Sequence, residues 1–329
     1  MANVYGISVA LLRPLAELLG RLDIDSAAFL DGLGIDAGAT PNTYIAGALV
    51  DARLDELARK RGDPAFALTL ARAAVVRPLG LFGHMVWLSG TVRDAITRAV
   101  KFYAMVTSRA TLTLDETTPR ATLRQHSVPG ASYSKTLTEF AFASLALRAR
   151  GATGGKFALA AVSFTHAGDP SARARYRAVF GAPVEFDAAI DELAFEVDQL
   201  DLALATADEV TSAALETTIS KLTTAQPRSV LVDRVRRTVA TNLGGAESYA
   251  SVAGKLGTSA RSLRRHLEHE GQSLRSVVDE LRRERADELL GAELPIKEVA
   301  FALGFSEPSA FSRAYKRWTG KAPRLGRVK

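Results

Sequence analysis

The last third of the chain carries a degenerate internal repeat, which restricts the possible folds more than any other feature. Four positions recur at a spacing of 47 residues: Ala253, Leu256, Gly257 and Ser259 in the first copy, and Ala300, Leu303, Gly304 and Ser306 in the second. Glycine favours the left-handed conformation that ends many helices, and serine accepts a hydrogen bond from the free amides that begin a helix. Each copy is therefore predicted to be a helix, a glycine turn, a capping serine and a second helix, which together form a helix-turn-helix unit.

The second helix of each copy, over residues 259–268 and 307–317, has a polar face whose members are three, four and seven positions apart. The two faces comprise Arg261, Arg264, Arg265 and Glu268 in the first copy, and Ser309, Ser312, Arg313 and Lys316 in the second. Arginine can bridge two acceptors on guanine or bind phosphate, and serine can contact base edges or phosphate. We predict that the arginines, serines and lysine of these faces bind double-stranded DNA.

A solvated surface is the alternative explanation for a charged helix face, and Arg265 and Arg313 would then hold carboxylates inside each unit. The charge distribution favours DNA instead. Residues 227–329 contain 20 Lys and Arg against 12 Asp and Glu, a net charge of +8, whereas the whole chain carries +6. A basic region joined to a near-neutral body is typical of a protein with a polyanionic partner, although a solubilising surface has the same composition.

The segment between the two copies, Leu274–Leu290, has a helical pattern of about 17 residues, which corresponds to a length of about 25 Å. A rigid helix of that length can hold two recognition helices about one turn of DNA apart, roughly 34 Å between centres. One chain is therefore predicted to enter two successive major grooves.

The first 226 residues alternate between helical and strand patterns. Apolar residues at three- and four-residue spacing predict helices over Ile45–Arg61, Pro64–Ala74, Thr91–Val106 and Tyr133–Arg150, and another from Asp169-Pro170 to Phe180. Strands are predicted over Arg109–Leu114, Ala121–Gln125 and Phe157–Thr165. Strand patterns stop after Gln226-Pro227. The expected fold is an α+β domain over residues 1–226, followed by an all-α domain over 227–329 that contains both helix-turn-helix motifs.

The sequence also excludes several kinds of site. The chain has no cysteine, so disulfides, thiolate metal sites and cysteine nucleophiles are absent. Arg13, Pro14 and Glu17 interrupt the apolar stretch at the N-terminus, and no apolar run approaches the roughly 18–20 residues that span a bilayer. We therefore expect a cytoplasmic protein that begins without a signal peptide and has no membrane partner.

Three other residue groups suggest weaker hypotheses. The segment 151–157 is similar to a phosphate-binding loop, but Phe157 replaces the required Ser or Thr, so we interpret it as a turn before a strand. His266 and His269 could share a helix face, but no third metal ligand follows them, and we expect no metal and no cofactor. Aromatic side chains can line a ligand cavity or belong to the core. The candidates to line a small-molecule cavity are Trp87, His126 and Tyr133.

The repeat region resembles the AraC/XylS family of bacterial transcription regulators. The resemblance spans about 248–327, and its densest runs are Ile296-x-x-Val299-Ala300-x-x-Leu303-Gly304-Phe305-Ser306 and Ser309-x-Phe311-Ser312-Arg313. It implies DNA recognition through both second helices, with base contacts from Arg261, Arg264, Arg265, Ser309, Ser312 and Arg313. It also implies an activator, a homodimer and RNA polymerase as a partner. Pro308 departs from the pattern, because many members have a polar side chain there.

Shorter pieces of the first 226 residues resemble the arabinose-binding-like sensing domain of a subgroup that includes ornithine-utilisation and mycobacterial virulence regulators. These pieces are Pro78-Leu79-Gly80-Leu81-Phe82-Gly83, Tyr176-x-x-x-Phe180-Gly181-x-Pro183-Val184-x-Phe186 and Phe195-x-x-x-x-Leu200-Asp201. The resemblance implies that residues 1–226 sense a small-molecule effector and dimerise.

Two other functions stay open at this point: a regulator whose N-terminal domain only dimerises or binds a protein, and an enzyme with a regulatory DNA-binding tail. Because nothing in residues 1–226 assembles a nucleophile with a base, we expect no enzymatic activity. A DNA-repair protein that accepts alkyl groups on cysteine is excluded, since the chain has no cysteine.

Overall fold

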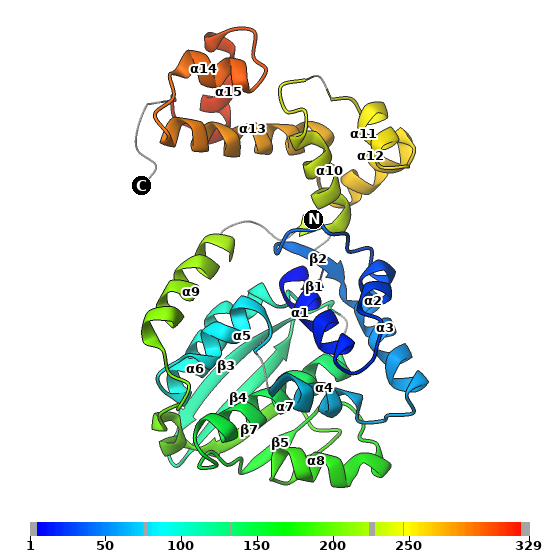
Figure 1. The fold of residues 1–329 in the computed structure, drawn as a ribbon, viewed down its shortest axis with the longest axis vertical. Helices are drawn as coiled ribbons and strands as arrows, with labels where there is room; N and C mark the ends of the chain where they lie inside the picture. The colour runs from blue at the N-terminus through cyan, green and yellow to red at the C-terminus, as the bar shows by residue number, and fades with distance from the viewer. Residues whose placement is uncertain (1–4, 76–77, 132, 224–227, 246, 324–329) are drawn as a thin grey trace. The chain divides into compact units, whose positions relative to one another are not determined.

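The computed structural model describes residues 5–75, 78–131, 133–223, 228–245 and 247–323. By internal contacts the chain divides into two compact units, with the division between Arg228 and Ser229 (Figure 1). The boundary predicted between residues 226 and 227 lies outside the described residues.

The N-terminal unit contains a five-stranded sheet in the order β3-β4-β7-β5-β6. The strands are β3 (Ala110–Thr117), β4 (Arg120–Ser127), β7 (Asp191–Glu196), β5 (Ala161–Ser163) and β6 (Val184–Glu185). β4 pairs antiparallel with β3 and β7, so that Leu123 lies between Leu114 and Leu193, whereas β5 and β6 are parallel. The strands predicted over 109–114 and 121–125 are confirmed, and the one predicted over 157–165 is only the three residues of β5.

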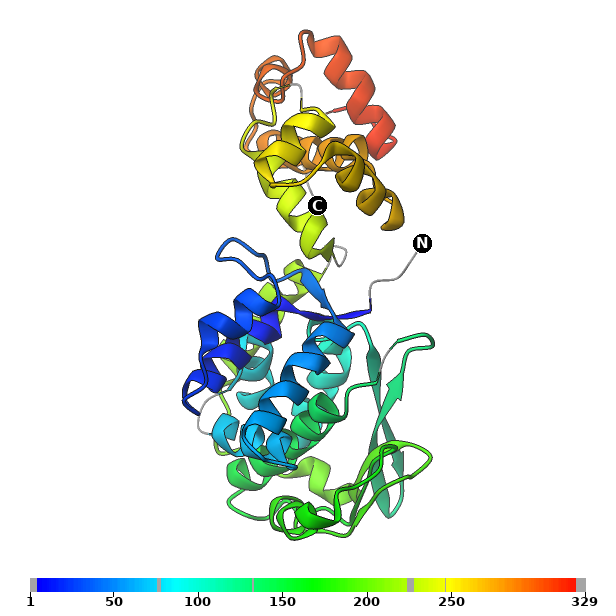
Figure 2. The same cartoon turned by 90° about the vertical axis from the view of Figure 1, so that its right-hand side faces the viewer.

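Helices cover one face of this sheet (Figure 2), and the other face carries charged side chains. In β4, Ala121, Leu123 and Gln125 are buried, whereas Arg124 on the opposite face binds Glu192, with 2.6 Å between Nε and Oε2. The helices α6 (Val92–Phe102) and α7 (Lys135–Ala152) cover the buried face, and α4 (Phe66–Val75) packs on α7. The period-two pattern of the sequence therefore separates core from solvent in this sheet.

The other elements of the N-terminal unit surround this layer. They are β1 (Gly6–Ser8), α1 (Val9–Gly20), α2 (Ser26–Gly32), β2 (Thr43–Ala46), α3 (Gly47–Lys60), α5 (Gly80–Trp87), α8 (Arg173–Phe180), α9 (Glu209–Thr223) and the 3-10 helices Tyr103–Met105, Pro170–Ala172 and Val197–Asp201. The two residues of β8 (Arg228–Ser229) lie on either side of the division between the units. A second sheet has the order β1-β2-β8. Two predictions are wrong here. Ile45 and Ala46 pair with β1 instead of starting a helix, and β8 is a short strand after Gln226.

The C-terminal unit consists of α10 (Val230–Ala240), α11 (Tyr249–Lys255), α12 (Ala260–His269), α13 (Leu274–Gly291), α14 (Ile296–Ala302) and α15 (Pro308–Thr319). α10, α11 and α12 pack at one end of α13, and α14 and α15 pack at the other (Figure 1). The α+β domain and the all-α domain with two helix-turn-helix motifs are confirmed.

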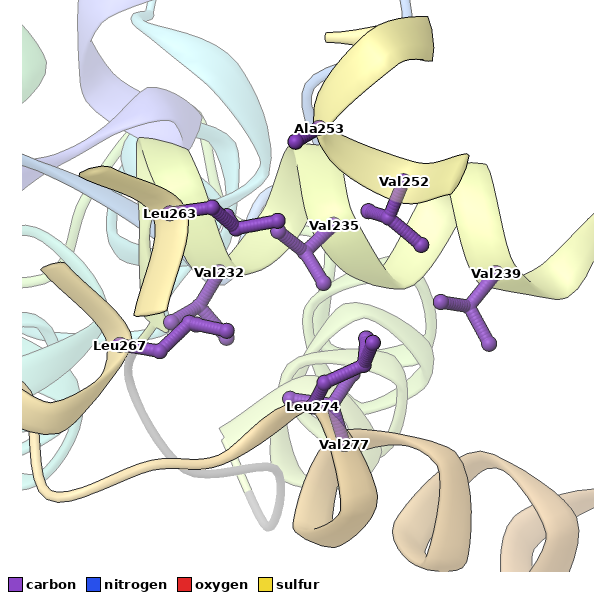
Figure 3. Packing of buried hydrophobic residues seen from close by; sticks show 9 residues of the cluster. All are labelled: Val232, Val235, Val239, Val252, Ala253, Leu263, Leu267, Leu274 and Val277. Atoms are coloured by element: carbon purple, nitrogen blue, oxygen red, sulfur yellow. The ribbon is translucent and has the colours of Figure 1, made fainter. Parts of the chain in front are cut away.

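The C-terminal unit has two hydrophobic cores, and α13 contributes to both. Figure 3 shows the first core, in which Leu263 and Leu267 of α12 pack with Val235 of α10 and Val277 of α13. The second core contains Leu290 from the other end of α13, together with residues of α14 and α15. Each helix-turn-helix motif therefore has a core of its own, and one continuous helix connects the two.

The two turns of the repeat are alike in backbone but differ in their caps. Gly257 and Gly304 both have positive φ, 67° and 77°, as the sequence predicts. Ser259 caps α12 by accepting a hydrogen bond from the amide of Ser262 at 3.1 Å. The cap predicted at Ser306 is wrong, because Glu307 precedes α15 and no side chain caps this helix. Pro308 occupies the first turn of α15 and has no amide hydrogen to be capped.

Among the described residues, no single helix is both long and apolar enough to cross a membrane, and only α4 and α5, taken together as a bent pair, reach that length and composition.

His266 and His269, the two histidines considered as metal ligands, are both exposed on α12.

Candidate DNA interface and ligand cavity

The first recognition helix, α12, separates its apolar and basic residues cleanly. Leu263 and Leu267 are 0% exposed in the first core, whereas Arg261, Arg264 and Arg265 are exposed. The difference follows from the sequence, because residues three or four positions apart share a face of the helix. The three arginines that the sequence assigns to DNA are therefore free of the core and available to a partner.

Arg264 also has a neighbour that the sequence did not indicate. Its guanidinium lies over the ring of Tyr249, with 4.8 Å from Cζ to the ring centroid. The Tyr249 hydroxyl in turn accepts a hydrogen bond from the amide of Leu274 at 3.0 Å. Tyr249 thus ties Arg264 of α12 to the start of α13, and a stacked arginine loses less conformational freedom when it binds.

The outer face of the second recognition helix, α15, carries both hydroxyl and cationic side chains. Phe311 is 0% exposed in the second core, and Ser309, Arg313 and Lys316 are exposed. The Ser309 hydroxyl donates to a carboxylate oxygen of Glu307 at 3.1 Å. Ser312 is half-buried, and its hydroxyl donates to the carbonyl oxygen of Pro308 at 2.9 Å. Ser312 therefore has its proton committed to its own helix and can offer a partner only its oxygen lone pairs.

The alternative role considered for Arg265 and Arg313 is not observed. Among the residues that the structure describes, neither arginine forms an ion pair with a carboxylate. The buried Arg236 of α10 holds carboxylates instead: it donates to Glu280 at 2.9 Å and also to Glu284, both on α13. Arg265 and Arg313 therefore form no ion pair that would hold the fold together, whereas Arg317 of α15 pairs with Asp279 of α13 at 3.3 Å.

Both recognition helices are fixed to the same helix, α13. Its 18 residues correspond to a length of about 27 Å. The Tyr315 hydroxyl of α15 donates to Asp287 of α13 at 2.7 Å, and burial raises the pKa of Tyr315 to about 12, so this donor stays protonated at neutral pH. Arg282 of α13 lies over the ring of Phe305, at 5.2 Å. α13 therefore sets the separation of the two basic faces.

The N-terminal unit contains a cavity of about 220 Å³ between the buried face of the sheet and the helices α5, α6 and α7. Trp87 of α5 and Tyr133 lie in its wall, as the sequence predicts. His126 does not, and this prediction is wrong. In β4 the residues of the cavity wall are Leu123, Gln125 and Ser127, so His126 lies on the other face of the strand, where its Nε2 is 2.8 Å from the hydroxyl of Thr113.

Two hydrogen-bonded groups contribute polar atoms to the cavity wall. The Tyr103 hydroxyl donates to Gln125 at 2.9 Å, and the Gln125 amide donates to the hydroxyl of Thr138 at 2.7 Å. Burial raises the pKa of Tyr103 well above its usual value. Arg148 donates to the carbonyl oxygen of Ala74 at 2.6 Å and lies 5.6 Å from the Trp87 ring. Burial lowers the pKa of Arg148 to about 10, which leaves it positively charged at neutral pH.

Two family models match the chain. Residues 24–204 match the arabinose-binding domain found at the N-terminus of AraC transcription regulators, and residues 252–327 match a helix-turn-helix domain. The first match alone covers more than half of the chain. The chain belongs to the AraC family of transcription regulators. In this AraC-family chain, DNA binding is the role of the helix-turn-helix region, and the N-terminal domain is of a ligand-binding type.

Two named regulators align with most of this AraC-family chain. It is 33% identical over 265 residues to the ornithine utilization regulator of Pseudomonas aeruginosa, covering 80% of this chain and 78% of that protein. It is 30% identical over 331 residues to the transcriptional regulator VirS of Mycobacterium tuberculosis, covering 95% and 93%. Among solved structures, the regulator CdpR of P. aeruginosa aligns with 94% of this chain and 95% of its own at a TM-score of 0.43 and 22% identity.

Proposed function

We propose that this AraC-family regulator is a ligand-responsive activator that recognises DNA sequence by inserting α12 and α15 into two successive major grooves. This proposal rests on one observation: α12 and α15 each have an exposed basic face, and both helices are attached to the single helix α13. The proposed DNA contacts are Arg261, Arg264, Arg265, Ser309, Ser312, Arg313 and Lys316. Lys316 suits a phosphate, because a flexible ammonium is a point charge, whereas the arginines have the paired donors that bind guanine.

The proposed division of labour places DNA binding in residues 227–329 and ligand sensing and dimerisation in residues 1–226. The cavity beneath the five-stranded sheet supports a small-molecule effector over an N-terminal domain that only dimerises, because a water needs roughly 10–15 Å³ of such space and this cavity is far larger. The other proposed partners are a second copy of the chain and RNA polymerase. An enzymatic N-terminal domain would be detected as turnover of a bound metabolite by the purified protein.

We expect DNA binding to depend steeply on salt. The net charge of +8 over residues 227–329 and the exposed arginines of α12 indicate several contacts to phosphate. The logarithm of the association constant should then fall linearly with the logarithm of the salt concentration, by about 0.9 for each phosphate neutralised. Fluorescence anisotropy of labelled duplex between 50 and 300 mM salt, on the order of the physiological range, measures the slope. A slope near zero would contradict a DNA-binding role for these faces.

Mutation should distinguish an arginine that contacts a base from a lysine that contacts phosphate. Arg264→Ala is expected to weaken specific binding by roughly 1–3 kcal/mol and to relax the preference at one base pair, because it removes a stacked, oriented guanidinium. Lys316→Ala should weaken binding to all sequences to a similar extent. Titrating both variants against a panel of single-base operator mutants makes the comparison. Equal losses of Arg264→Ala on operator and scrambled duplex would show that Arg264 contacts only the backbone.

A further inference from the structure

Tyr249 is the first residue of α11, and its side chain is held at both ends. The Tyr249 hydroxyl accepts a hydrogen bond at 3.0 Å from the amide of Leu274, the first residue of α13. The side chain also packs against the first core of the C-terminal unit. The ring cannot swing away without losing the hydrogen bond or the core contact, so it offers a fixed surface to its neighbours.

The guanidinium of Arg264 lies over this fixed ring, with 4.8 Å from Cζ to the ring centroid. A guanidinium is planar and has five N–H donors, so a ring against its face leaves the donors at its edge available. No carboxylate pairs with Arg264 in the part of the chain that the structure describes. The paired donors that suit guanine are therefore oriented by the ring and remain available to a partner.

The second motif lacks both members of this pair. Ile296 begins α14 at the position where Tyr249 begins α11, 47 residues earlier. Arg264 of α12 corresponds to Ser312 of α15, because each directly follows a fully buried apolar residue. Ile296 also packs against its own core, so core packing at this position does not require an aromatic side chain. The ring is present in the motif that has an arginine and absent from the motif that has a serine.

We propose that Tyr249 is a positioning residue for base recognition, which holds the Arg264 guanidinium in the orientation that reads a base and so strengthens the sequence preference of the first motif. Without the ring, the long arginine side chain would sample many rotamers, and ordering it on DNA would cost free energy. Tyr249 acts through Arg264 and needs no contact of its own with DNA. This role rests on the proposed reading of bases by α12 and adds the residue that supports it.

Selection of bound sequences from a duplex library with a randomised centre measures base preference without knowledge of the operator. The unaltered full-length chain is compared with its Tyr249→Leu and Arg264→Ala variants on the same library. Exposed cation–π contacts correspond to about two- to fivefold in an equilibrium constant, so Tyr249→Leu should reduce the preference at one base pair by this factor. Arg264→Ala should reduce the preference at the same base pair by more.

Two results would overturn the positioning role: an unchanged preference in Tyr249→Leu, or an equal loss of affinity for the enriched duplex and for a scrambled one. Circular dichroism checks that each variant is folded. If Tyr249→Leu does not fold, Tyr249→Met takes its place, because the flexible methionine side chain can fill the space of the ring without stacking.

A conservative variant separates the ring from its hydroxyl. Tyr249→Phe keeps the surface under Arg264 and loses only the acceptor for the Leu274 amide, so it should retain the base preference of the unaltered chain. A loss equal to that of Tyr249→Leu would show that the hydroxyl acts by holding α13, and the stacking role would be wrong. Ile296→Leu, at the equivalent position of the second motif, is the matched control and should not alter the preference at this base pair.

The double variant shows whether Tyr249 acts through Arg264. Adding Tyr249→Leu to Arg264→Ala should reduce the preference no further, since the side chain to be positioned is already absent, and a further loss would contradict the proposal. If Arg264→Ala relaxes the preference but Tyr249→Leu does not, base reading by α12 stands and the positioning role is wrong. If neither variant alters the preference, base reading by Arg264 fails and the role of Tyr249 fails with it.

Discussion

A fragment of residues 227–329 is expected to bind the same half-site as the whole chain. If the whole chain dimerises as proposed, the fragment should bind an operator with two half-sites roughly 10²–10⁴-fold more weakly. In a dimer joined through residues 1–226, the second DNA-binding unit reaches its half-site by an intramolecular step, and the fragment loses this advantage. The fragment should still fold, because each end of α13 has its own buried core. It should also lose any response to a ligand of the N-terminal cavity.

Circular dichroism and gel-shift titration of the fragment and the whole chain, on operators with one and two half-sites, make this comparison. On a single half-site the two proteins should differ little, which is the internal control for a folded fragment. A fragment that binds the two-half-site operator as tightly as the whole chain would contradict dimerisation through residues 1–226. An unfolded fragment would contradict the proposed independence of the DNA-binding unit.

Alanine substitution at the equivalent glycines of the two repeats, Gly257 and Gly304, should lower the free energy of unfolding by very different amounts. Gly257→Ala is expected to lower the free energy of unfolding by about 1–2 kcal/mol, the cost of placing a side chain at a left-handed position. Gly304→Ala should cost roughly 2–5 kcal/mol, because overpacking adds to this strain. An added Cβ at Gly304 would overlap the backbone of Gly244, whereas no atom lies within 4 Å of the position at Gly257.

Urea denaturation of the two variants measures both costs under the same conditions, and each variant is the matched control for the other. The difference between them should also appear in DNA binding, since the turn at Gly304 precedes α15 and the second recognition helix. Similar costs for the two substitutions would show that the backbone between α10 and α11 moves aside readily. That outcome would remove the close approach of Gly244 to Gly304 as a constraint on the second motif.

The close approach of Gly244 to Gly304 matters to the second motif because the segment between α10 and α11 contacts both halves of the C-terminal unit. Leu243 packs against the first core and also against the second, and its carbonyl oxygen accepts hydrogen bonds from Arg282 of α13 at 3.3 Å. The repeat in the sequence suggests two equivalent motifs. The packing makes them unequal, because only one of the two glycine turns lies against this shared segment.

Most features of the DNA-binding unit could be predicted from the sequence because they are local. The glycine turns, the length of α13 and the outward arginines of α12 depend on spacings of a few residues within a helix or turn, which the backbone geometry converts directly into position. The strands β3 and β4 were predictable for the same reason. The wrong cap at Ser306 shows the limit of the repeat. A proline disfavours helical backbone at the residue before it, so Glu307 is extended and α15 begins only at Pro308.

The two-motif architecture and the residues that face away from its cores follow from local sequence patterns alone. Three other features depend on contacts between distant elements: Tyr249 supports Arg264, Gly244 confines Gly304, and Gln125 lines the cavity of the N-terminal unit while its neighbour His126 lies outside. These contacts join residues far apart in the chain, or depend on which face of a strand meets the covering helices. A local pattern specifies that faces alternate, but the packing of distant elements decides which face encloses the cavity.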